Sequence, residues 1–194
     1  MKTLSTVKEF PINKNDHFTQ SLGMIITIGS LAMLFITLLV SYGILRVRAN
    51  IWNSQTIDTL PLILIFINTG VILFSSYTYF KGNKSAVIHN RLTTQKWVNT
   101  TISLGFIFLI FQIVIWFILT SNGFIMTSSQ ISAVFYLLSG LHGIHLIAGL
   151  ILLIWLNIKI QLMENNHLHL KLVGMFWHFL TIVWIVIFST VIII

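Results

Sequence analysis

Three histidines lie in strongly apolar stretches of this 194-residue chain, and imidazole can ligate haem or another metal. His142 and His145 are three residues apart, and His178 follows further along the sequence. Side chains three apart on a helix share a face, so His142 and His145 cannot approach one haem from opposite sides. A two-histidine haem site would therefore need His178 as a partner.

The expected depths of these histidines argue against shared ligation. Counted from the same end of the bundle, His178 lies about 6 residues and His145 about 13 residues in, a difference of ~10 Å at 1.5 Å per residue. Metal–imidazole bonds are only ~2 Å long. Three interpretations stay open: a haem site, a non-haem metal site, and neutral histidines that hydrogen-bond to hydroxyl or carbonyl groups and hold helices together.

The elements that carry these histidines follow from the distribution of charge. The chain is 56% hydrophobic and 8% charged, and it has no cysteine. Four uncharged runs of 29, 22, 62 and 23 residues begin after Asp16, Asp58, Lys96 and Lys171. A bilayer-spanning helix needs about 20 mostly apolar residues. This pattern excludes soluble enzymes, secreted domains and nucleic-acid binders, and the lack of cysteine excludes thiolate metal sites and disulfides.

The uncharged runs predict an all-α, polytopic membrane protein with five transmembrane helices. As one helix, the 62-residue run would be ~93 Å long, so we expect it to break at the polar stretch 120–130. We expect an N-terminal tail over residues 1–21 and one membrane domain over 22–194. Its spans are expected at Leu22–Leu45, Leu60–Phe80, Val98–Leu119, Ala133–Ile158 and Leu172–Ile194.

Lysine and arginine are distributed unequally between the two ends of these helices. Nine lie in the N-terminal tail and in the second and fourth connections, and Arg46 and Arg48 lie in the first connection. Cytoplasmic segments carry the excess of Lys and Arg. We therefore expect a cytoplasmic N-terminus, a periplasmic C-terminus and an anionic lipid surface beside the nine cations.

Polar residues recur at helical spacing within the spans, and we expect these stripes to face the interior of the bundle. They are Thr27, Ser30, Thr37 and Ser41 in the first span, Asn68, Ser75 and Tyr79 in the second, Thr101, Gly105 and Gln112 in the third, and His178, Thr181 and Ser189 in the fifth. The spans hold no formal charge and no internal proline, which argues against an ion-coupled transporter. A small channel or carrier stays an alternative.

Small residues gather in the fourth span, where they favour a close helix crossing. They are Ser139, Gly140, Gly143 and Gly149.

Three strings of residues are more specific than their composition. The second span reads LPL at 60–62, then NT at 68–69 and SSYT at 75–78; the fourth reads LHGIHL at 141–146; the fifth reads FWHF at 176–179 and VWI at 183–185. In this order and spacing, the chain resembles subunit III of the haem–copper terminal oxidases, in its short five-helix bacterial form. The resemblance runs from about Gly23 to the C-terminus.

This resemblance implies a non-catalytic subunit of an aerobic respiratory oxidase in the bacterial inner membrane. It implies that the chain binds no haem, copper or other metal, because the redox centres belong to partner subunits. The chain would pack on subunit I, beside subunit II and a small subunit IV, hold phospholipid, stabilise turnover and join a respiratory supercomplex; it would bind no nucleic acid. By resemblance, His142, His145 and His178 would be helix-locking groups. Together with Asn68 and Ser75 of the second span, they make up the expected intramembrane polar cluster.

Two positions depart from the family pattern. The family often has Glu where this chain has Leu31, and Asp where it has Thr181. A role that needs an intramembrane acid should therefore be absent. The departures keep open one alternative, an accessory subunit of a nitric oxide reductase-type complex. The histidines leave a second alternative, a free-standing bis-histidine haem protein.

Overall fold

The protein is all-helical in a computed structural model that describes residues 14–48, 59–88, 90–123, 125–126, 130–161 and 167–192. Each of the five helices is long and apolar enough to cross a membrane. The prediction of an all-α chain with five helices able to span a membrane is therefore confirmed. The helices are α1 (Lys14–Arg48), α2 (Thr59–Val87), α3 (Arg91–Ser121), α4 (Gln130–Gln161) and α5 (His167–Ile192).

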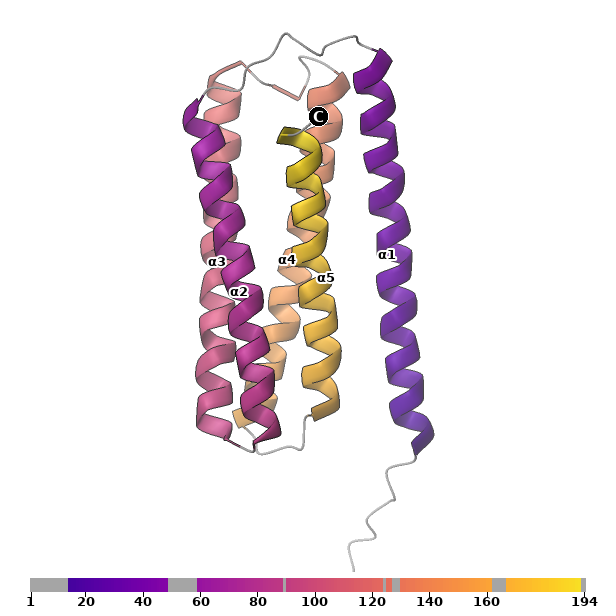
Figure 1. Ribbon diagram of the computed structural model, residues 1–194, viewed down its shortest axis with the longest axis vertical. Helices are drawn as coiled ribbons and strands as arrows, with labels where there is room; N and C mark the ends of the chain where they lie inside the picture. The colour runs from indigo at the N-terminus through magenta and orange to yellow at the C-terminus, as the bar shows by residue number, and fades with distance from the viewer. Residues whose placement is uncertain are drawn as a thin grey trace, which may run out of the picture.

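Four of the helices form a closed bundle, and the first lies outside it (Figure 1). Around the bundle, α2 packs on α3, α3 on α4, α4 on α5, and α5 on α2. The indigo helix α1 packs only on α4 and α5 within the described chain. Helices α4 and α5 therefore each contact three other helices, whereas α2 and α3 contact two, so the histidine-bearing helices lie at the centre of the molecule.

The helices continue past the apolar runs at the end of the bundle that carries most of the lysines. Helix α2 passes through Lys81 and Lys84 to Val87, and α3 already begins at Arg91. Lysine and arginine are good helix formers, so the end of an apolar run does not end the helix. Similarly, α1 begins at Lys14, inside the expected tail, while residues 1–13 of that tail lie outside the described residues.

Capping residues mark the ends of α3. Asn90 precedes the helix, and its side-chain oxygen accepts a 3.2 Å hydrogen bond from the Thr93 amide. At the other end, the Asn122 amide donates to the Ile118 carbonyl, and Gly123 follows with a φ of 82°. Glycine adopts this left-handed conformation without steric cost. The 62-residue uncharged run is therefore divided by a turn after Ser121.

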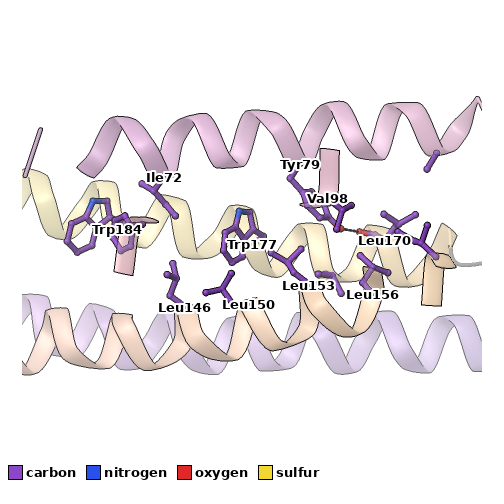
Figure 2. Packing of buried hydrophobic residues seen from close by; sticks show 14 residues of the cluster. Ile72, Tyr79, Val98, Leu146, Leu150, Leu153, Leu156, Leu170, Trp177 and Trp184 are labelled. Carbon is purple, nitrogen blue, oxygen red and sulfur yellow. Dashed lines mark hydrogen bonds between the residues drawn. The ribbon is translucent and has the colours of Figure 1, made fainter. Parts of the chain in front are cut away.

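A hydrophobic core runs along the four-helix bundle (Figure 2). Leu146, Leu150, Leu153 and Leu156 of α4 recur every three or four residues, so they line one face of that helix against α5. A separate cluster joins α1 to the bundle, and its buried members are Phe35, Leu138, Val183 and Ile187.

Candidate functional site

Polar side chains of α2 hydrogen-bond to α3 inside the bundle. The Asn68 amide nitrogen donates to Gln112 Oε1 at 3.1 Å. The hydroxyls of Thr78 and Thr101 lie 2.9 Å apart, and Ser75 donates to the Thr101 carbonyl at 3.3 Å. All of these polar side chains are buried. The polar stripes predicted for the second and third spans therefore face each other.

The same helix also bonds to α5, through two indoles and a phenol. Trp177 Nε1 donates to Ser75 Oγ at 3.3 Å, and Trp184 Nε1 donates to Thr69 Oγ1 at 3.2 Å. Tyr79 is fully buried, and its hydroxyl donates to the Leu170 carbonyl at 2.7 Å, drawn as a dashed line in Figure 2. Each large ring thus places a polar atom against a partner on the neighbouring helix.

Two of the three intramembrane histidines make hydrogen bonds that hold helical structure. His178 Nδ1 and Ser76 Oγ lie 2.6 Å apart and join α5 to α2. His145 Nδ1 lies 2.7 Å from the Leu141 carbonyl of its own helix. Because a carbonyl oxygen can only accept, Nδ1 of His145 carries the proton in this contact.

His142 is fully buried among aromatic rings. Its ring centroid lies 5.2 Å from that of Trp184, 6.1 Å from that of Phe108 and 6.4 Å from that of Phe35. Neither ring nitrogen has a hydrogen-bond partner among the described residues. Rings from α1, α3 and α5 therefore meet at this one side chain of α4.

The five residues predicted as one polar cluster occupy separate places in the bundle. His142 packs against Trp184, whereas His178 bonds to Ser76; on α5 these contacts are six residues, or ~9 Å, apart. Asn68 and Ser75 bond to α3 and α5 instead of to the histidines. Within the described parts of the chain, no group of three or more His, Cys, Asp or Glu side chains could hold a metal ion.

Trp177 fills a notch between two glycines at the centre of the bundle. A Cβ atom on Gly105 of α3 would lie 3.0 Å from the indole and 2.7 Å from Leu150 Cδ2. A Cβ on Gly149 of α4 would lie 3.2 Å from the same indole. These distances are shorter than most contacts between real side chains, so Leu150 or the Trp177 indole would have to shift if either glycine carried a side chain.

The other small residues of α4 differ in their surroundings. Ser139 is buried and donates to the Phe135 carbonyl of its own helix. A Cβ on Gly140 would make an ordinary 3.8 Å contact with Trp116, and one on Gly143 would meet nothing within 4 Å.

A close contact that the sequence did not single out lies at Gly174 of α5, where a Cβ would lie 2.6 Å from Tyr79. Glycine spacing alone cannot identify it, since its partner is a ring on another helix.

The stripe predicted for α1 does not face the bundle, so that prediction was wrong. Thr27, Ser30, Thr37 and Ser41 are all exposed. Thr27 and Thr37 donate to carbonyls one turn earlier in their own helix. Hydroxyls that bond to their own backbone can face outward even in an apolar solvent.

The two positions that lack the family's acid lie on inward-facing surfaces. Leu31 is half-buried on α1, and Thr181 is buried on α5. Thr181 Oγ1 donates to the Trp177 carbonyl at 3.1 Å. A neutral side chain that hydrogen-bonds to its own helix therefore occupies the α5 position.

The fold and its interior define a multi-pass membrane protein whose helices are joined by neutral hydrogen bonds and aromatic packing. Residues 12–194 match the family model described as cytochrome c oxidase subunit III. The chain belongs to this family, whose members are subunits of terminal oxidase complexes.

Relatives with both kinds of oxidase name support this assignment. The chain is 28% identical over 173 residues to cytochrome c oxidase subunit 3 of Synechocystis, covering 87% of this chain and 73% of the relative. It is 31% identical over 175 residues to a probable cytochrome c oxidase subunit 3 of Nocardia farcinica, and 33% identical over 177 residues to a probable quinol oxidase subunit 3 of Staphylococcus aureus. Each of these two alignments covers 88% of this chain and 86% of the relative.

Proposed function

We propose that the chain is a non-catalytic subunit III of an aerobic respiratory haem–copper oxidase in a bacterial inner membrane. In this role it packs on the catalytic subunit I, holds phospholipid and stabilises turnover. The complex, with its haem and copper in partner subunits, reduces oxygen to water and translocates protons.

The observation that carries this proposal is the neutrality of the bundle interior. The sequence has no Asp or Glu between Asp58 and Glu164, so α2, α3 and α4 contain none. Proton pumps and ion-coupled transporters use chains of ionisable groups, acidic residues among them, within their spans, whereas His142 and His178 of this bundle make separate contacts. The interior polar groups instead join α2 to α3 and α5. Such an interior suits a scaffold that supports redox chemistry carried by other subunits.

The asymmetry of positive charge supports a cytoplasmic N-terminus and a periplasmic C-terminus. Nine Lys and Arg residues belong to the N-terminal, second-connection and fourth-connection end, against Arg46 and Arg48 at the other. The positive-inside bias is counted over short connections like these. A cysteine introduced at either end of the cysteine-free chain tests this topology by its reaction with a membrane-impermeant thiol reagent.

Purification from native membranes tests the proposed complex. A tagged chain should bring down a haem–copper catalytic subunit in equal amount, and the eluate should reduce oxygen. Recovery of the chain without such a subunit would contradict the proposal. Nitric oxide reduction without oxygen reduction would instead support an accessory role in a nitric oxide reductase-type complex.

One observation favours a haem-binding alternative: His142 is fully buried, and both its ring nitrogens lack a partner among the described residues. We expect His142→Ala, and likewise His145→Ala, to weaken the bundle or its attachment to the catalytic subunit without changing the haem spectrum of the complex. The chain expressed alone should show no Soret band. A Soret band that His142→Ala abolishes would establish the haem-binding alternative.

A further inference from the structure

A lysine near the α2–α3 turn is held between two aromatic rings. Lys81 Nζ lies 4.9 Å from the ring centroid of Tyr77 and 5.1 Å from that of Trp97. The neighbouring Gly82 lets α3 approach closely, because a Cβ there would lie only 3.1 Å from Trp97 Cβ. The rings attract the ammonium group through their π faces. Its position at the junction of the two helices is therefore defined by packing.

Further cations lie near Lys81 on the same pair of helices. Lys84 follows one turn later on α2, and Lys96 precedes Trp97 on α3; both are exposed at the ends of their helices. The sequence contains no Asp or Glu from residue 59 to residue 163. Arg91 is different, because its guanidinium donates to the Gln161 carbonyl of α4. Three lysines thus present positive charge at one end of the α2–α3 pair, and these two helices contain no acidic residue.

Apolar surface lies directly alongside this charge. Tyr77 is half exposed, and its ring lies 6.3 Å from the exposed ring of Phe74, one turn further from the charged end. Phe80, next to Lys81, is also exposed. Tyrosine, tryptophan and lysine prefer the depth of lipid headgroups, with apolar residues toward the acyl chains. An acidic protein segment would match the lysines but not the phenylalanines.

We propose that Lys81, Lys84 and Lys96, with Tyr77 and Trp97, bind the phosphate of an anionic bilayer phospholipid whose acyl chains lie along Phe74 and Phe80. We call Lys81, Lys84, Lys96, Tyr77 and Trp97 the basic hairpin end. The proposal rests on the proposed function in one respect: the experiment that tests it uses the purified oxidase complex. It assigns a specific place and headgroup charge to the lipid that the subunit is proposed to hold.

Native mass spectrometry of the detergent-purified complex tests this site, with phosphatidylglycerol as the probe. Lys81→Gln should lower the retained phosphatidylglycerol about fivefold, since a lysine near an anionic lipid surface contributes ~1 kcal/mol. The matched control is Lys171→Gln, which removes an exposed lysine of α5 near the same end. An equal effect of the two substitutions would overturn the site, because it would indicate only general attraction.

Further binding experiments distinguish a bound phospholipid from other bound anions. In nanodiscs, phosphatidylglycerol should occupy the site and phosphatidylcholine should not, and millimolar inorganic phosphate should not displace the lipid. Displacement by inorganic phosphate, or occupancy by an acidic protein in place of lipid, would overturn the proposal. Lys81→Arg should retain the lipid, which controls for damage to the fold. If the complex is not recovered, the proposed function fails, and the same measurement on the isolated chain still decides the lipid site.

Discussion

Helix α1 and the bundle of α2–α5 are equally able to cross a membrane, yet they are held in different ways. In the most apolar 18-residue stretch of α1, 6% of residues are buried, whereas the corresponding share in the other four helices is 28% to 56%. Helices α2, α3 and α5 are joined by side-chain hydrogen bonds. Helix α1 contributes aromatic packing, with Phe35 against His142 and His145 of α4.

This difference places most of the burial within α2–α5, with α1 packed along one side of that bundle. Lipid tails are as apolar as leucine, so apolar contact alone adds little to helix association in a bilayer. Close packing at glycines and hydrogen bonds between helices must therefore stabilise the association of the helices. Within the described residues, both are concentrated in α2–α5. The two regions should consequently respond differently to substitution.

The largest expected effect is on the bundle, from Trp177→Ala. This change empties the notch between Gly105 and Gly149 and removes the indole donor to Ser75. We expect a loss of about 3–5 kcal/mol in the free energy of unfolding, the range for a buried Trp-to-Ala change. Thermal unfolding of the purified complex measures it. Trp155→Ala, at a 40% exposed indole, is the control and should cost much less; equal losses would contradict the central role of Trp177.

A methyl group added at Gly105 is the next largest change. Gly105→Ala brings a Cβ to 2.7 Å from Leu150 Cδ2, and overpacking of this kind costs about 1–3 kcal/mol. Gly143→Ala is the matched control, because its Cβ meets nothing within 4 Å. The melting temperature of Gly105→Ala should therefore be lower than that of the unsubstituted protein, whereas that of Gly143→Ala should be unchanged. A less stable Gly143→Ala variant would mean that α4 packs differently.

Substitution at Phe35 tests how α1 is held against the bundle. Phe35→Ala removes edge-on ring contacts to His142 and His145, each worth about 0.5–1.5 kcal/mol. We expect faster hydrogen exchange in α1 and unchanged exchange in α2–α5. Hydrogen-exchange mass spectrometry resolves the two regions. Loss of protection throughout the bundle would show that α1 is integral to the core.

The smallest expected effect comes from one hydroxyl. Tyr79→Phe keeps the buried ring and removes its 2.7 Å hydrogen bond to the Leu170 carbonyl. We expect a loss of about 1 kcal/mol, seen as a small fall in melting temperature with intact assembly. A variant that fails to assemble would assign this hydroxyl a larger role than a single helix–helix bond.

The uncharged runs were sufficient to predict five helices, because a bilayer requires apolar length and a hydrogen-bonded backbone. They did not predict the ends, since α2 continues through Lys84 and α3 begins at Arg91. An apolar run gives the part of a helix that is in lipid, and the helix itself ends at caps such as Asn90 and Asn122.

Polar spacing predicted part of the interior. Thr101 and Gln112 are buried, as expected for an inward stripe, yet Thr27 and Thr37 have the same type of spacing and are exposed. Periodicity identifies a face of a helix but not what that face contacts. The pairing of Gly174 with Tyr79 depends on how α2 and α5 cross, which a single sequence does not contain.

The central claim is that this chain supports an oxidase without carrying its redox chemistry. The most direct measurement compares the purified complex with and without the chain, recording the haem spectrum and oxygen consumption during sustained turnover. We predict the same haem spectrum and a similar initial rate, followed by faster loss of activity when the chain is absent. Loss of a haem signal together with the initial rate would contradict the claim and assign a redox centre to this chain.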